Sequence, residues 1–89
     1  MRVTVVSPER AVFDGEATSL VAPAYDGLVG ILPGHAPFVT LLGDGVLTLR
    51  QGAGGAEPAR YRVSGGFLQV VGGAQDTVRV VADSVADFS

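Results

Sequence analysis

Two short stretches in the middle of the chain decide its fold: residues 45–50 read GVLTLR, and residues 59–64 read ARYRVS. Apolar and polar side chains alternate in both, so Leu47 and Leu49 would face one way while Thr48 faces the other. Successive side chains of a β-strand point to opposite faces, so this pattern is typical of strands with one buried and one exposed face. Two sheets packed face to face would satisfy it.

The rest of the chain has the same character. Short β-rich runs are separated by Gly, Pro and Asp, and no window of eleven or more residues has apolar positions at helical spacing. The pattern predicts an all-β sandwich of two packed sheets. Its strands are expected over residues 2–6, 10–14, 16–22, 28–32, 38–42, 45–50, 59–64, 67–71 and 77–82.

Turn-forming residues mark the expected connections between these strands. Asp-Gly at residues 14–15 predicts a tight turn between two short strands. Residues 51–58 hold three glycines and predict a hairpin loop, while Gly-Gly at 65–66 predicts a bend where a strand changes sheets. Near the end, Asp-Ser at residues 83–84 could cap a short helix.

Composition excludes several classes of function. The chain has 89 residues, of which 47% are apolar and 17% are charged, so one compact domain with some exposed apolar surface is expected. Its net charge of −3 and its six scattered arginines argue against a nucleic-acid binder. With no cysteine, disulfides and cysteine-based metal sites are excluded. No signal peptide or spanning segment is recognisable, so we expect a cytosolic protein that touches a membrane only through another protein.

The segment at residues 26–37, DGLVGILPGHAP, is unusual. Three glycines and two prolines within twelve residues specify a shaped loop of low flexibility. Four apolar residues lie between them, and strand alternation would point two of the four away from the core. Two interpretations stay open: a turn whose apolar residues are buried, or a rigid apolar tip presented to a partner.

Candidate catalytic residues are few. His35 is the only histidine, and beside two prolines it is expected to hold the loop through a hydrogen bond. A triad could be drawn from Ser64, His35 and Asp26, but no nucleophile elbow or oxyanion motif accompanies them. Glycines at residues 52–55 lack the lysine and following helix of a phosphate-binding loop. We therefore expect no enzyme activity, no catalytic residue, no cofactor and no metal.

Four stretches of the chain together resemble one protein family. They are VSPERAVFDGEA at residues 6–17, Gly27 with GILPGHAP at 30–37, SGGFLQV at 64–70 and VRVVAD at 78–83. In order and spacing they resemble the N-terminal β-sandwich domain of the epsilon subunit of F-type ATP synthases. The resemblance covers nearly the whole chain, and the GILPGHAP block is its most specific part.

The resemblance implies a sandwich of about ten strands in the central stalk of a rotary motor. It implies that this rotor subunit couples the gamma subunit to the ring of c subunits for proton-driven ATP synthesis. The complex would place it at the cytoplasmic face of the bacterial inner membrane, as a peripheral component. Carried over by position, the residues at or near the partner contact would be Leu28, Val29, Gly30, Ile31, Pro33, Gly34 and His35.

Two departures from the family pattern affect these expectations. Many relatives carry an acidic residue at the position of Leu28, so an apolar contact would replace a charge-assisted one here. The family also continues into a helical hairpin that can inhibit ATP hydrolysis. We expect a sandwich domain at residues 1–84 and a short tail at 85–89 where that inhibitory arm would begin. A free-standing β-sandwich binding module is the alternative function, and a small hydrolase using His35 is a third.

Overall fold

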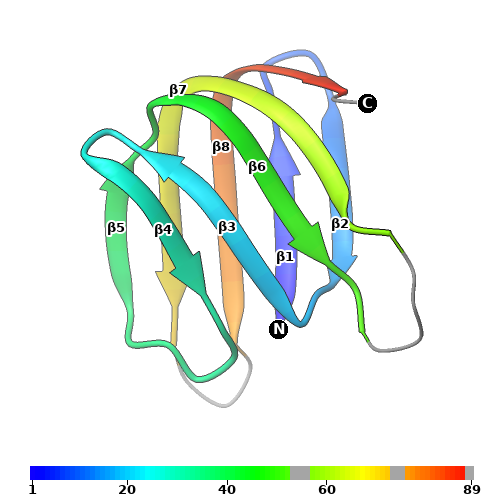
Figure 1. Cartoon of the computed structure of the whole chain (residues 1–89), viewed down its shortest axis with the longest axis vertical. Helices are drawn as coiled ribbons and strands as arrows, with labels where there is room; N and C mark the ends of the chain where they lie inside the picture. The colour runs from blue at the N-terminus through cyan, green and yellow to red at the C-terminus, as the bar shows by residue number, and fades with distance from the viewer. Residues whose placement is uncertain (53–56, 73–75, 88–89) are drawn as a thin grey trace.

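A computed structural model describes residues 1–52, 57–72 and 76–87 of the chain. In these residues the chain forms eight strands and no helix, as Figure 1 shows, which confirms the all-β fold. Nothing helical in this part of the chain has the length and apolar character needed to cross a membrane. The strands are β1 (Arg2–Val6), β2 (Ala11–Glu16), β3 (Ser19–Ala24), β4 (Gly27–Ile31), β5 (Phe38–Leu41), β6 (Asp44–Arg50), β7 (Ala59–Val71) and β8 (Thr77–Asp87).

All the strands belong to one hydrogen-bonded sheet that folds over into two layers. Its order is β2-β1-β8-β7-β6-β3-β4, and β5 pairs with β7 beside this path. In Figure 1 the front layer holds β4, β3, β6 and the first half of β7, while β5, the second half of β7, β8, β1 and β2 form the back layer. Neighbouring strands are antiparallel, except that β1 runs parallel to β8.

The two layers are joined by a bend that β7 and β8 make together. Gly65 and Gly66 both have positive φ angles, 69° and 106°, which side-chain-bearing residues rarely adopt. A β-carbon added to Gly66 would lie 2.0 Å from the Val81 carbonyl oxygen, far inside van der Waals contact. The predicted bend is therefore confirmed, but it bends one strand instead of separating two. Because β7 and β8 each serve both layers, the eight strands supply ten strand segments, in agreement with the expected sandwich.

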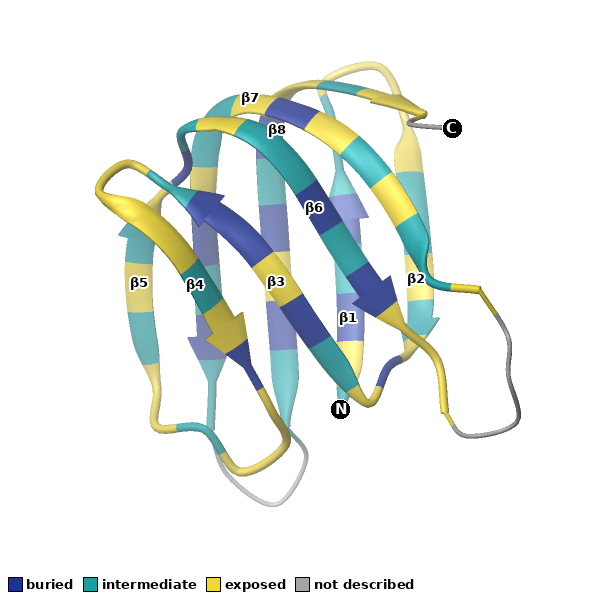
Figure 2. Ribbon diagram, viewed as in Figure 1, coloured by how far each residue is buried: buried dark blue, intermediate teal, exposed yellow. Residues whose placement is uncertain are grey.

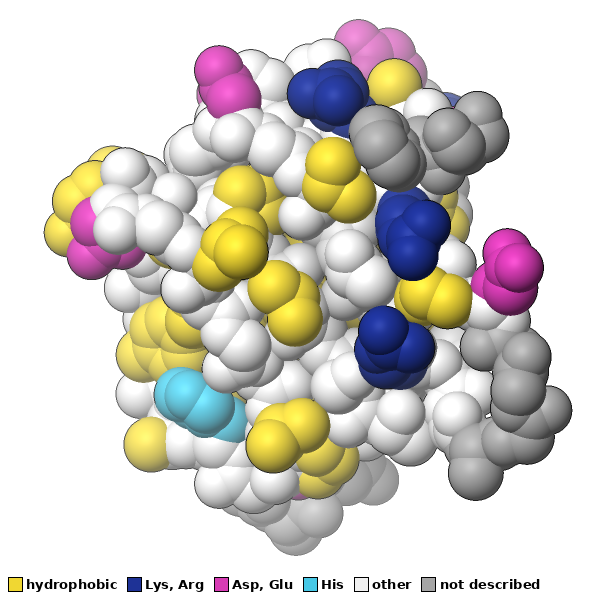
Figure 3. Space-filling model, in the orientation of Figure 1, with side chains coloured by type: hydrophobic (Ala, Val, Ile, Leu, Met, Phe, Trp, Pro, Cys, Tyr) yellow, Lys and Arg dark blue, Asp and Glu magenta, His cyan; other side chains and the backbone are white. Residues whose placement is uncertain are grey.

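The space between the layers is filled by aliphatic side chains. Leu47 and Leu49 are fully buried, while Thr48 between them is half-buried, so the alternation predicted from the sequence is confirmed. In Figure 2 the buried positions recur at every second residue along several strands. No polar or charged residue of the described chain is buried, and Figure 3 shows basic and acidic side chains on the outer surface that faces the viewer. The largest fully buried side chains are Leu20, Ile31, Leu47, Leu49, Leu68, Val3, Val5, Val63, Val78 and Val80.

The tight turn predicted at residues 14–15 is wrong. Asp14 and Gly15 lie inside β2, where they pair with Thr4 and Val3 of β1. The Arg2 guanidinium also forms an ion pair with the Asp14 carboxylate at 2.6 Å. An Asp-Gly pair forms a hairpin turn only when its flanking residues pair with each other, and here β1 pairs with both flanks.

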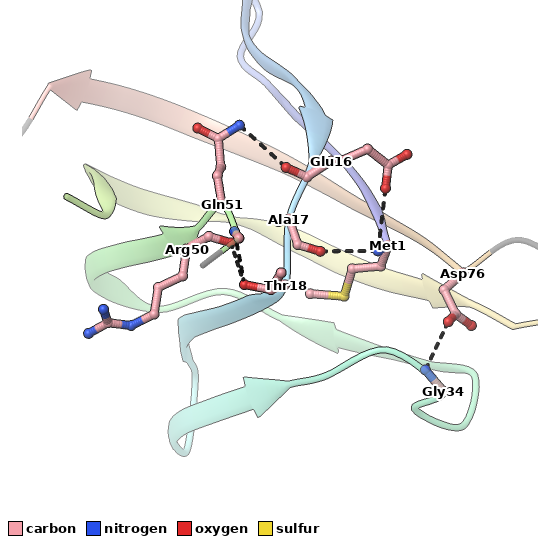
Figure 4. A network of polar contacts seen from close by, with 9 residues as sticks. Met1, Glu16, Ala17, Thr18, Gly34, Arg50, Gln51 and Asp76 are labelled. Atoms are coloured by element: carbon pink, nitrogen blue, oxygen red, sulfur yellow. Dashed lines mark hydrogen bonds and ion pairs between the residues drawn. The ribbon is translucent and has the colours of Figure 1, made fainter. Parts of the chain in front are cut away.

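The chain crosses between layers at residues 17–18 instead. The terminal nitrogen of Met1 donates a hydrogen bond to the Ala17 carbonyl oxygen at 3.0 Å, and the Thr18 hydroxyl donates to the Arg50 carbonyl oxygen at 3.1 Å. Gln51 Nε2 donates to the Glu16 carbonyl oxygen at 3.3 Å, and these contacts are drawn in Figure 4. This crossing is thus tied to β1 in one layer and to β6 in the other.

The short helix that Asp83 or Ser84 could have capped does not form. Both residues lie within β8, which continues to Asp87 and pairs there with Tyr61 of β7. The domain boundary expected at residue 84 therefore falls inside a strand. The hairpin loop predicted at 51–58 does connect two antiparallel strands, β6 and β7, although its residues 53–56 lie outside the described residues.

Replacing Gly66 with alanine should destabilise the domain severely. The new β-carbon would collide with the backbone of β8, and the positive φ angle would add strain. A loss of about 3 kcal/mol or more in the free energy of unfolding is expected. Urea unfolding followed by circular dichroism measures it.

Gly30→Ala is the matched control for this substitution. Gly30 lies in β4, and no atom lies within 4 Å of a β-carbon built on it. This variant should unfold within about 1 kcal/mol of the unmodified protein. Similar stabilities for the two variants would contradict the role given to the bend.

Candidate functional site

The unusual segment at residues 26–37 connects the two layers at one edge of the sandwich. β4 is the last strand of the front layer, and β5 pairs only with β7 in the back layer. Residues 32–37 run from the end of β4 to the start of β5, along the lower left of Figure 1. This loop therefore lies where both layers end, and it is accessible from outside the sandwich.

Some apolar residues of the segment are buried, as in an ordinary turn, and others are exposed, as in a tip presented to a partner. Ile31 is 1% exposed and belongs to the core, and Val29 is half-buried against it. Leu28 and Leu32 are 76% and 63% exposed. Two of the four apolar side chains thus anchor the segment, and the other two project into solvent. The remaining predicted site residues, Gly30, Pro33, Gly34 and His35, are exposed apart from half-buried His35.

Hydrogen bonds hold the loop in its shape. The Gly34 amide donates to the Asp76 carboxylate at 2.9 Å, a contact drawn in Figure 4. Gly34 has a φ of 86°, the left-handed region that glycine adopts most readily. Within the loop, the His35 amide donates to the Leu32 carbonyl oxygen at 3.2 Å. The loop is thereby fastened both to itself and to the residue just before β8.

The histidine ring contributes to this scaffold. Its Nδ1 lies 2.8 Å from the Ala36 carbonyl oxygen, which can only accept, so the ring nitrogen donates. The ring also packs against Phe38, with 4.9 Å between centroids and a tilt of 44°. The hydrogen bond that the sequence analysis expected His35 to make is therefore present. Asp76 is a partner that sequence reasoning missed, because nothing in the sequence links residues 42 positions apart.

The hypothetical catalytic triad does not assemble. Ser64 Oγ donates to Asp44 Oδ1 at 2.6 Å, on the front layer, whereas His35 bonds within its own loop. In the described part of the chain, no three His, Cys, Asp or Glu side chains gather closely enough to hold a metal ion. The glycine-rich stretch at 52–55 lies outside the described residues except for Gly52, whose amide donates to the Thr18 hydroxyl.

More exposed apolar residues lie near the loop than its sequence suggested. Tyr25, just before β4, is 69% exposed, and its amide donates to the carbonyl oxygen of Leu41 in β5. Val39 and Leu41 are 64% and 61% exposed. In β4 and β5 the exposed positions alternate with inward-facing ones, so Leu28 lies on the outer surface of the front layer, and Val39 and Leu41 lie on that of the back layer. Leu28 and Leu32 are the exposed large apolar side chains of the loop segment itself, and exposed apolar patches usually mark surfaces that bind another protein.

A β-sandwich made from one bent sheet, with an exposed loop at one edge, places this chain in the class of small all-β sandwich domains. Within that class, this chain belongs to the family of ATP synthase delta/epsilon chain β-sandwich domains, whose model matches residues 1–87. The match includes every stretch on which the resemblance rested and confirms it.

Curated relatives agree with this assignment. The chain is 42% identical over 83 residues to the ATP synthase epsilon chain of Leptospira borgpetersenii, and 40% identical over 84 residues to that of Moorella thermoacetica. These alignments cover 93% and 94% of this chain but 61% and 59% of the relatives. The chain therefore spans about three fifths of the length of the curated relatives it matches.

Solved structures share the fold. A chain in the Euglena gracilis mitochondrial ATP synthase, in a structure of OSCP, F1 and the c-ring, superposes with a TM-score of 0.82 at 22% identity. This covers 96% of this chain and 51% of that chain. A chain in the central stalk and c-ring of the Tetrahymena thermophila enzyme gives 0.76 at 17% identity, covering 97% and 65%. At these identities the likeness establishes the fold.

Replacing Asp76 with alanine should loosen the loop without unfolding the domain. The Gly34 amide would lose its acceptor, so its hydrogen exchange should become at least about tenfold faster. Amide exchange measured by NMR tests this. Asp26→Ala removes an exposed carboxylate near the same edge and should leave the Gly34 rate unchanged. Equal rates in the two variants would show that Asp76 does not hold the loop.

Proposed function

We propose that this domain is a rotor subunit of an F-type ATP synthase, where it couples the gamma subunit to the c ring. The observation that carries the proposal is a stiffly held apolar loop on a domain of the delta/epsilon family. The domain would act mechanically, with no catalysis and no cofactor of its own. As part of the complex it would be peripheral, on the cytoplasmic face of a bacterial inner membrane.

The mechanical role makes physical demands that this fold meets. Torque passes between two partners only if the body between them does not deform. Close-packed protein interiors have low compressibility and transmit strain. Here a single sheet continues through both layers, because β7 and β8 cross from one to the other. A force applied at the loop would therefore reach the opposite layer through covalent chain and strand pairing.

Within the loop segment, we assign different tasks to the residues. Leu28 and Leu32 would make direct apolar contact with the c ring, because their side chains are largely exposed. Val29 and Ile31 would anchor the contact in the core. Gly34 and His35, with Pro33, would set the loop's shape through its hydrogen bonds. Gly30 lies two residues after Leu28 on the same face of β4, and because it has no side chain it would leave room for the partner beside Leu28.

Binding measurements with the two proposed partners test this function. Purified domain should bind the gamma subunit of its own ATP synthase, and the detergent-solubilised c ring carrying gamma, at micromolar concentration or tighter. Isothermal titration calorimetry measures the affinity for the gamma subunit. The affinity for the c ring carrying gamma is measured by binding of the domain to that complex immobilised on a surface. Absence of binding to both would overturn the proposal and leave the free-standing binding module as the remaining function.

The double variant Leu28→Ser/Leu32→Ser should weaken binding to the c ring by at least about tenfold. Burying a leucine contributes about 1.5–3 kcal/mol, so losing two such contacts exceeds a factor of ten even when burial is partial. Leu41→Ser serves as control, because it removes a similarly exposed leucine outside the loop segment. Unchanged affinity for the c ring in the double variant would contradict the assignment of the loop.

A further inference from the structure

The outer surface of the front layer carries an uneven distribution of charge. Three of the chain's six arginines project there from β6 and the first half of β7, as Figure 3 shows on its right side. Their strand neighbours Leu49, Tyr61 and Val63 face the core, which leaves the arginines pointing outward. We call this surface the arginine face; it consists of Val21, Val46, Thr48, Arg50, Arg60 and Arg62.

Strand register brings these residues together. Thr48 pairs with Val21 on one side and with Arg60 on the other, and Val46 pairs with Arg62. Arg60 is therefore diagonal to Arg50, at a separation of about 7–8 Å between α-carbons. Arg62 follows Arg60 by two residues, which is about 7 Å along the strand. Three arginines and two valines thus lie on the same face of the front layer.

Two of the three arginines on this face have no acidic partner within the part of the chain that the structure describes. Arg50 and Arg60 form no ion pair among the described residues. The carboxylate of Asp44 lies at the far end of β6, six residues from Arg50 and about 20 Å away, and accepts a hydrogen bond from Ser64. Arg50 and Arg60 are diagonal neighbours, so their positive charges add on this face and attract a partner's carboxylates.

The net charge of the chain and the side chains around the arginines favour one class of binding partner for this face over the others. Nucleic acid and anionic lipid both attract proteins through extended positive charge, but this chain has a net charge of −3. Val21, which is 38% exposed, and Val46 beside it give the face an apolar component. Arginines next to apolar side chains are characteristic of protein–protein contacts, where they bind carboxylates through two parallel hydrogen bonds.

We infer that the arginine face docks a segment of another protein that carries carboxylates beside apolar side chains. The apolar side chains would cover Val21 and Val46, and the carboxylates would pair with Arg50 and Arg60. Asp44 would repel them at the opposite end, so the segment binds in one direction. This surface is separate from the loop at the β4–β5 edge, and the inference does not depend on the proposed function.

Two matched synthetic peptides test the inference. One is an amphipathic helix whose apolar side chains are flanked by glutamates at one end, and the other has glutamine at those positions. Fluorescence anisotropy should show at least about fivefold tighter binding of the glutamate peptide, because only it offers carboxylates to the arginines. NMR shifts of backbone amides should map the contact to β3, β6 and the first half of β7.

Charge reversal supplies the matched variants. Arg60→Glu should abolish the preference for glutamate, whereas Arg79→Glu should keep it, because Arg79 lies in the back layer paired with Gln69. Both variants change the net charge equally, and thermal unfolding checks that both stay folded. Equal affinity for the two peptides, or equal loss in the two variants, would overturn the inference. So would Arg60-dependent binding to phosphatidylglycerol vesicles or single-stranded DNA without binding to the glutamate peptide.

Discussion

The structure depends on the close backbone contact between Gly66 of β7 and Val81 of β8. Only a residue without a side chain fits there, and only glycine readily adopts the positive φ angles at residues 65 and 66. The contact lets two paired strands bend together without losing their hydrogen bonds on either side of the bend. As a result, one sheet becomes both layers of the sandwich, and fifteen apolar residues of the described ranges become buried in its core.

This construction has a consequence for the binding surfaces. A sheet that folds over itself ends in two strands at the same side of the molecule, β4 in front and β5 behind (Figure 1). The segment joining them must pass across that open side, and its buried residue Ile31 fixes where it starts. The hydrogen bond between Gly34 and Asp76 then ties its middle to the start of β8. Leu28 and Leu32 are held outward by the fold itself, which is why we assign a partner to them.

Sequence reasoning succeeded where one strand and its own neighbours determine the outcome. Alternation in residues 45–50 predicted which side of β6 is buried, and the glycine pair at 65–66 predicted a bend. It failed at residues 14–15, where a good turn signal was overridden by pairing with β1 and by the ion pair between Arg2 and Asp14. It also failed at residues 83–84, where pairing with β7 extends β8 beyond the predicted strand end.

The sequence by itself determined the all-β class, the alternating core and the unusual loop, because these follow from side-chain periodicity and from backbone preferences of glycine and proline. Only the tertiary structure decided which apolar residues of the loop are exposed, what holds Gly34, and which arginines share a face. Gly34 and Asp76 lie 42 positions apart in the chain, and Arg50 and Arg60 share a face only because of the register between β6 and β7. Such contacts depend on strand order and register, which local sequence patterns do not specify.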